Sequence, residues 1–211
     1  MSIDIFPNRR LYQFGYCAVL ARGVTPADLL ARVGGEGLHA VALTRTETAL
    51  IEALGEDIDE GDVPEAEFDR LRDSGVLAGD GPVLRAGTHN GWSFVIEPEG
   101  SYLAADDIAK SVSRETVALS LRDSESGSCW ISYAEDGEIL SSFDPLFPHN
   151  DYGTRPAVLD RLTGHVAAIH NGDRADAYMN AVRAIQQRLR CTVPQEADES
   201  RLLTIRIEGG Y

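Results

Sequence analysis

Hydrophobic and polar residues alternate along several short stretches of the chain, and this period of two predicts β-strands. In residues 91–98 Trp92, Phe94 and Ile96 alternate with polar neighbours. Two pairs of stretches are joined by turns that favour positive φ, His89-Asn90-Gly91 and Asp136-Gly137. Both turns indicate antiparallel hairpins. Strands are expected at residues 11–21, 38–43, 82–88, 91–98, 116–122, 129–133, 138–143 and 202–207.

Other stretches carry the period of an amphipathic helix. The clearest is 173–189, where apolar residues recur every three or four positions. A helix is also expected to begin at Thr25-Pro26, because a hydroxyl N-cap precedes a proline at the first helical position, and to end at Gly34-Gly35. Shorter helices are expected at residues 46–54, 64–71 and from 154 onward, and residues 102–111 are expected to form a helix or a loop across the sheet.

These elements predict an α+β fold: a mixed, mainly antiparallel sheet of about six or seven strands with helices packed on one face. No repeat or Pro/Gly-rich linker divides the chain, so residues 1–211 are expected to form a single domain. Within it lie an acidic insertion at 47–80 that could form helices, and a helical C-terminal part at 154–190.

The charge of the chain is concentrated in that insertion. The net charge is −15 over 211 residues, and residues 47–80 hold 12 acidic residues against Arg70 and Arg72. An anionic surface of this kind repels nucleic acid and anionic lipid, and it attracts basic proteins. The alternative interpretation is a solvated face that keeps the protein in solution.

Composition and cysteine content indicate the compartment in which the protein resides. Hydrophobic residues make up 43% and charged residues 25%, and no apolar run has the length of about 18 residues that a membrane helix needs. The first residues carry an acid, with no apolar stretch of a secretory signal after it. Three widely spaced cysteines, Cys17, Cys129 and Cys191, suit buried thiols in a reducing compartment. A cytoplasmic protein with no membrane association is therefore expected.

Candidate catalytic and metal-binding motifs are weak. Ser126-Gly127-Ser128-Cys129-Trp130 matches the end of the papain-type signature, but Cys129 enters a predicted strand instead of a helix N-terminus, where a thiol is activated. His165 and His170 are five residues apart and would face different sides of a helix. No His-Glu-x-x-His, Cys-x-x-Cys, phosphate-binding glycine loop or Gly-x-Ser-x-Gly motif is present. The sequence therefore predicts no catalytic residue, no metal site and no cofactor.

Three motifs occur in order near the middle of the chain: Gly-Trp-Ser-Phe-Val-Ile-Glu-Pro at 91–98, Tyr-Ala-Glu-Asp-Gly-Glu at 133–138 and Ser-Phe-Asp-Pro-Leu-Phe-Pro at 142–148. With them the sequence resembles an uncharacterised family of actinobacterial proteins of unknown function. The resemblance implies no activity. It implies a shared framework that includes Trp92, Glu97, Asp136, Gly137, Phe143 and Asp144.

Two function classes follow. The first is a non-enzymatic protein-binding module, such as an immunity, antitoxin or defence-system accessory protein, that binds a basic partner. Its charged contacts would come from five acids of the insertion, Glu52, Glu56, Asp57, Asp59 and Glu60. The alternative is a small-molecule-binding protein or hydrolase with a pocket near the ends of the central strands. That pocket would be lined by Trp92, Glu97, Asp144 and His149.

Overall fold

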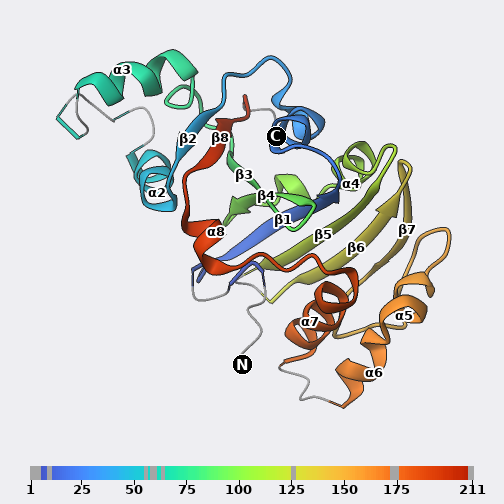
Figure 1. Ribbon diagram of the computed structural model, residues 1–211. Helices are drawn as coiled ribbons and strands as arrows, with labels where there is room; N and C mark the ends of the chain where they lie inside the picture. Colours follow the sequence, from blue (N-terminus) through green and yellow to red (C-terminus); the bar gives the residue numbers. More distant parts are fainter. Residues whose placement is uncertain are drawn as a thin grey trace.

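In the described part of the chain, eight antiparallel strands form one sheet (Figure 1). The computed structural model describes residues 6–8, 11–54, 57, 61–62, 65–124, 127–171 and 176–208. The strand order is β2-β8-β3-β4-β1-β5-β6-β7, and every neighbouring pair in it is antiparallel. The strands are β1 Gly15–Arg22, β2 Val41–Leu43, β3 Val83–His89, β4 Trp92–Pro98, β5 Val117–Ser124, β6 Cys129–Glu135, β7 Glu138–Phe143 and β8 Leu202–Arg206.

Helices cover this sheet, and two of them lie beyond its edge at one end. They are α1 Pro26–Leu30, α2 Arg45–Leu54, α3 Glu65–Ser74, α4 Asp106–Val112, α5 Val158–Thr163, α6 His165–His170, α7 Ala177–Leu189 and α8 Gln195–Glu199. A π-helical turn at Ala31–Gly35 continues α1, and a 3-10 turn at Tyr102–Ala104 precedes α4. Among the helices of the described ranges, none is both long and apolar enough to cross a bilayer.

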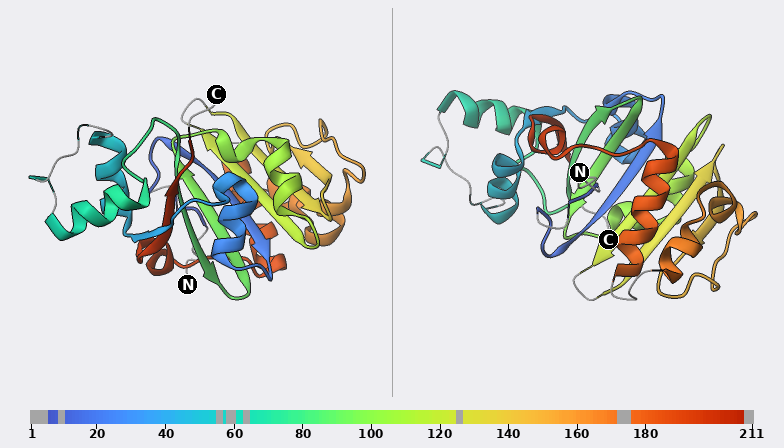
Figure 2. Two further views of the ribbon diagram at one scale, coloured as in Figure 1. Left: turned by 90° about the horizontal axis from the view of Figure 1, so that it is seen from above. Right: turned by 60° about the horizontal axis from the view of Figure 1, so that its bottom comes forward.

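The predicted α+β class is confirmed, and three details of the prediction differ. Over the described residues the sheet has eight strands, every neighbouring pair is antiparallel instead of mixed, and helices cover both faces (Figure 2). Along β1, Ala18 and Leu20 belong to a core under α5, α6 and α7, whereas Val19 belongs to a second core under α1 and α4. Because successive side chains of a strand point to opposite faces, a strand that is apolar at every position is covered twice.

The predicted turns are confirmed. Asn90 and Gly91 have φ values of 51° and 79°, and they join β3 to β4 as a two-residue hairpin. Asp136 and Gly137 join β6 to β7 with φ values of 51° and 82°. Both pairs have the positive φ values that a tight hairpin of this twist requires. The helix start at Thr25 is confirmed as well, since its side chain accepts a hydrogen bond from the Asp28 N–H.

The first predicted strand is shorter than expected. Residues 11–14 form a turn, in which the Gly15 N–H donates to the Tyr12 carbonyl, and β1 begins only at Gly15. Gly15 has a φ of 106°, which redirects the chain before the strand. This early turn matters because residues 11–14 border the pocket described below.

The acidic part of the chain forms a lobe, which we call the acidic lobe: the described residues of 47–80, with most of α2 and all of α3. It lies beyond edge strand β2 at one end of the sheet (Figure 1). A small apolar cluster fixes it to the sheet, with Ile51 of α2 and Leu71 of α3 packed near Val41, Leu43 and Val83. The lobe therefore holds its charges on a folded support.

Candidate functional site

The residues predicted to form a pocket at the strand ends do not converge. Trp92 and Glu97 begin and nearly end the same strand and lie on opposite faces of it. Trp92 is part of the larger core and only 3% exposed. Asp144 and His149 follow β7, which is separated from β4 by β1, β5 and β6. These four residues therefore line no common cavity.

Glu97 has a structural environment. Its side chain is buried, and its two carboxylate oxygens accept hydrogen bonds from the N–H groups of Tyr102 (3.1 Å) and Leu103 (2.9 Å). Burial raises the pKa of Glu97, and these backbone donors oppose that shift. Glu97 thus fixes the turn that follows β4. Asp144 plays a similar part after β7, because its Oδ1 accepts the N–H of Leu146 at 2.8 Å.

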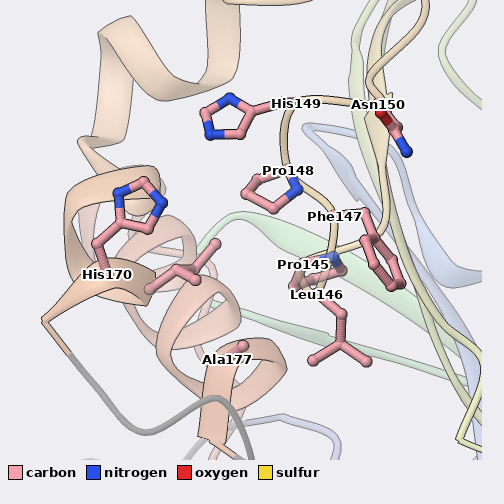
Figure 3. Close-up of a pocket in the computed structure, with 9 residues that line it drawn as sticks. Pro145, Leu146, Phe147, Pro148, His149, Asn150, His170 and Ala177 are labelled. Carbon is pink, nitrogen blue, oxygen red and sulfur yellow. The ribbon is translucent and has the colours of Figure 1, made fainter.

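His149 lines an apolar pocket of about 440 Å³ between residues 145–150, α6 and the start of α7 (Figure 3). Its ring lies 5.9 Å from that of His170, centroid to centroid, and Figure 3 shows the two imidazoles at the same side of the pocket. Two imidazoles are fewer ligands than a protein metal site uses. Within the part of the chain that the structure describes, no group of three or more His, Cys, Asp or Glu side chains could hold a metal ion.

Cys129 does not occupy the setting of a papain-type nucleophile. It is the first residue of β6, it is buried, and its Sγ donates to Asp123 Oδ1 at 3.4 Å. Ser126 of the same sequence fragment lies outside the described residues. The other two thiols are buried also, and burial raises the pKa of Cys17 and of Cys191 to about 12. Such thiols stay protonated at neutral pH.

The acids predicted to contact a partner differ in their positions. Glu56, Asp59 and Glu60 lie outside the described residues. Asp57 is exposed on the acidic lobe. Glu52 retains exposed surface, but it lines a pocket of about 280 Å³ where β1 begins and β4 ends.

We call this cavity the charged pocket. Its wall consists of residues 11–15, one face of α2, Arg85 of β3, and Pro98 and Glu99 at the end of β4. The α2 face is formed by Arg45, Thr48, Ala49 and Glu52, which recur at i, i+3, i+4 and i+7. Four separate parts of the chain therefore meet at one cavity, and three of them bring charged residues, of both signs, to it.

A buried ionic network underlies the charged pocket. The Arg85 side chain has no exposed surface, and its Nη1 donates to Asp198 Oδ1 of α8 at 3.3 Å. Its Nη2 donates to the carbonyls of Asp198 (2.7 Å) and Ser200 (3.2 Å). The Tyr12 hydroxyl donates to both carboxylate oxygens of Asp198, at 2.8 and 2.9 Å. Burial raises the pKa of Asp198, against the effects of the Tyr12 hydrogen bond and of Arg85.

Glu52 has an unusual electrostatic environment. Although part of its side chain is exposed, its surroundings desolvate the carboxylate, and the nearby Glu99 carboxylate adds repulsion, with a smaller repulsion from Glu97. Attraction to Arg206 and Arg85 only partly offsets these effects, and the pKa of Glu52 rises to about 7. At neutral pH this carboxyl is poised between its two protonation states.

Sequence reasoning missed three charged residues of this pocket. Arg45 and Glu52 share a helix face, which the i, i+7 spacing could have indicated. Arg85 interrupts the apolar run of β3, and a charge in a buried strand is a signal of a buried partner. Glu99 follows β4 without any local signal, since it reaches the pocket only through the pairing of β4 with β1.

Comparison with known proteins assigns the chain to a family. No curated protein and no solved structure matches the chain significantly. One family model does match, over residues 6–190, which is most of the chain. The protein therefore belongs to the family of unknown function DUF6461, in agreement with the predicted membership of an uncharacterised family.

Proposed function

We propose that the protein is a binding module whose acidic lobe docks a basic protein partner. In this proposal it acts in the cytoplasm of an actinobacterium, without catalysis, as an immunity, antitoxin or defence-system accessory protein. The observation that supports the proposal is the presentation of charge by the lobe. Its exposed carboxylates include those of Asp57, Asp62, Asp69, Asp73 and Asp80.

Part of the anionic surface of the lobe is carried on helices that pack against the sheet. Ile51 and Leu71 bury the inner sides of α2 and α3, so the Asp69 and Asp73 carboxylates are carried on a packed helix. Within the described part of the lobe, three acids form ion pairs with arginines: Asp69 with Arg72 at 2.5 Å, Asp73 with Arg72 at 3.9 Å, and Glu47 with Arg201 at 2.5 Å. Charges held in fixed positions complement a basic surface better and increase the rate of association with it.

Matched charge variants test this proposal. Asp57→Asn combined with Asp73→Asn removes two charges from the lobe, whereas Asp107→Asn combined with Glu138→Gln removes two exposed charges elsewhere. Cross-linking in cells of the source organism, followed by purification in low and moderate salt, should recover a basic protein with the wild type and the control. The lobe variant should recover several-fold less. An equal loss for both variants would mean that net charge alone, and not the lobe, governs the association.

The alternative function, a small-molecule-binding protein or a hydrolase, also stays a proposal. One observation favours the small-molecule-binding function, namely the charged pocket at the start of β1 and the end of β4. This is the part of the sheet where the sequence placed a pocket, but the lining consists of other residues. Of the predicted hydrolase residues, Glu97 on β4 lies apart from Asp144 and His149, which both follow β7, and this separation gives the hydrolase proposal no support.

A further inference from the structure

The charged pocket holds groups of both signs that do not neutralise one another. With the described residues, Arg45 makes one side-chain hydrogen bond, from its Nη1 to the Leu11 carbonyl at 3.0 Å. Across the described ranges, no ion pair within 4.0 Å joins Arg45, Glu52 or Glu99 to a group of opposite charge. A pocket that keeps such charges apart is complementary to a ligand that carries both signs.

The two signs lie at opposite ends of the α2 face. Arg45 and Glu52 are two turns apart, which corresponds to a rise of about 10 Å along the helix. Glu99 approaches Glu52 from the end of β4 and raises its pKa, so the two acids share the negative end. Glu99 is held there in a left-handed conformation with a φ of 58°. A ligand that matches both ends of the pocket therefore carries its positive and negative groups several ångströms apart.

The rest of the wall suits an aliphatic stem and one further acceptor. Phe14 lines the pocket with 57% of its surface exposed, and it offers a ring to an apolar chain or a cation. Arg85 also lines the pocket and is fully buried, and its Nε has no hydrogen-bond partner in the part of the chain that the structure describes. An unmatched donor beside a cavity indicates an acceptor atom on the ligand.

We propose that the charged pocket binds a basic α-amino acid, with its carboxylate at Arg45 and its side-chain cation between Glu52 and Glu99. The stem of the ligand lies against Phe14, and a carboxylate oxygen is the acceptor nearest to Arg85. The volume of about 280 Å³ is below that of pockets for drug-sized ligands, about 300–1,000 Å³, and suits one amino acid. The same chemistry occurs in a free amino acid and in the last residue of a peptide.

This inference rests on the binding half of the alternative function and is independent of the acidic lobe's partner. It also predicts linkage to protons. A cation placed between Glu52 and Glu99 removes their mutual repulsion and lowers the pKa of Glu52 from about 7. Binding near neutral pH therefore releases a proton, which isothermal titration calorimetry detects as a heat that changes with the ionisation enthalpy of the buffer.

Four ligands separate the contributions to binding. L-Arginine has both charges, L-citrulline lacks the side-chain cation, agmatine lacks the carboxylate, and Nα-acetyl-L-arginine represents a peptide C-terminus. We expect L-arginine to bind in calorimetry, and citrulline and agmatine to bind at least tenfold more weakly. If acetyl-arginine binds as tightly as arginine, the ligand is the C-terminal residue of a peptide. If only arginine binds tightly, the ligand is the free amino acid.

Protein variants complete the test. Glu99→Gln should weaken the binding of arginine at least fivefold and leave the binding of citrulline unchanged, because only arginine places a cation beside Glu99. The matched control is Glu115→Gln, which alters another exposed glutamate of positive φ, 59°, in a different hollow of the surface. Citrulline or agmatine binding as tightly as arginine would overturn the dipolar ligand but keep a small-molecule site. Failure of all four ligands would overturn the small-molecule function as well, while the lobe variants test the protein partner separately.

Discussion

Replacing Arg85 with methionine should lower the free energy of unfolding by about 3–5 kcal/mol, the range for removal of one partner from a buried ion pair. The magnitude follows from complete burial. The side chains of Arg85 and Asp198 are 0% and 2% exposed, so water cannot replace the guanidinium. Methionine fills much of the volume but donates no hydrogen bond, and among the described residues the Asp198 carboxylate then retains only the Tyr12 hydroxyl as a side-chain donor.

The pH dependence of that loss identifies its cause. Burial already raises the pKa of Asp198, and without Arg85 it rises further. A carboxyl whose pKa is raised by folding contributes most stability at low pH, where it is protonated, and stability falls as the pH rises through the folded-state pKa. The variant should therefore lose less relative to wild type at pH 4 than at pH 8.

Urea denaturation at pH 4 and pH 8 measures both quantities. The double variant Arg85→Met with Asp198→Asn is the control, because it removes the isolated charge and keeps an acceptor for Tyr12. It should be more stable than Arg85→Met alone. A loss below about 1 kcal/mol for Arg85→Met, in the range of an exposed pair, would refute the reasoning. So would a loss that is the same at both pH values.

Three further predictions follow from single sites. Glu52→Gln should stabilise the protein at pH 8 and have little effect at pH 4. Folding raises the pKa of Glu52 from 4.5 to about 7, so the stability of the wild type falls as the pH rises through this window. An equal gain in stability at both pH values, measured by urea denaturation, would point to packing instead. Cys17 and Cys191, with pKa values of about 12, should react with Ellman's reagent at pH 8 only as the protein unfolds, and reaction within seconds of mixing would contradict their burial. Gly100→Ala should cost more than about 2 kcal/mol in thermal or urea denaturation, since its Cβ would lie 1.7 Å from the Glu97 Oε1 atom; a near-neutral result would show that the turn can rearrange.

Local signals in the sequence were sufficient for most of the sheet. The Asn90-Gly91 and Asp136-Gly137 turns fix two hairpins by backbone conformation alone, and the alternation of Trp92, Phe94 and Ile96 sets which side of β4 faces the larger core. Such features depend on residues within a few positions of one another. A window of sequence therefore contains the physical information that determines them.

The short helix α8 and the separation of α6 from α5 were not predicted, because α6 and α8 are only six and five residues long and show less than two turns of periodicity. Helices of this length form through tertiary contacts rather than intrinsic propensity. Ile169 of α6 packs in the larger core, and Asp198 of α8 joins the Arg85 network. Their stability comes from partners far along the chain, which the local pattern does not contain.

The charged pocket was out of reach for the same reason, and its construction shows why it depends on the whole fold. The turn at residues 11–14, the α2 face, Arg85 and Glu99 meet only after β1 pairs with β4 and β4 pairs with β3. The Asp198 partner of Arg85 lies beyond residues 6–190, which the family model covers. The charge of Arg85 beside the pocket is therefore stabilised by the C-terminal segment, so a change in α8 should alter the electrostatics of a pocket to which α8 contributes no lining residue.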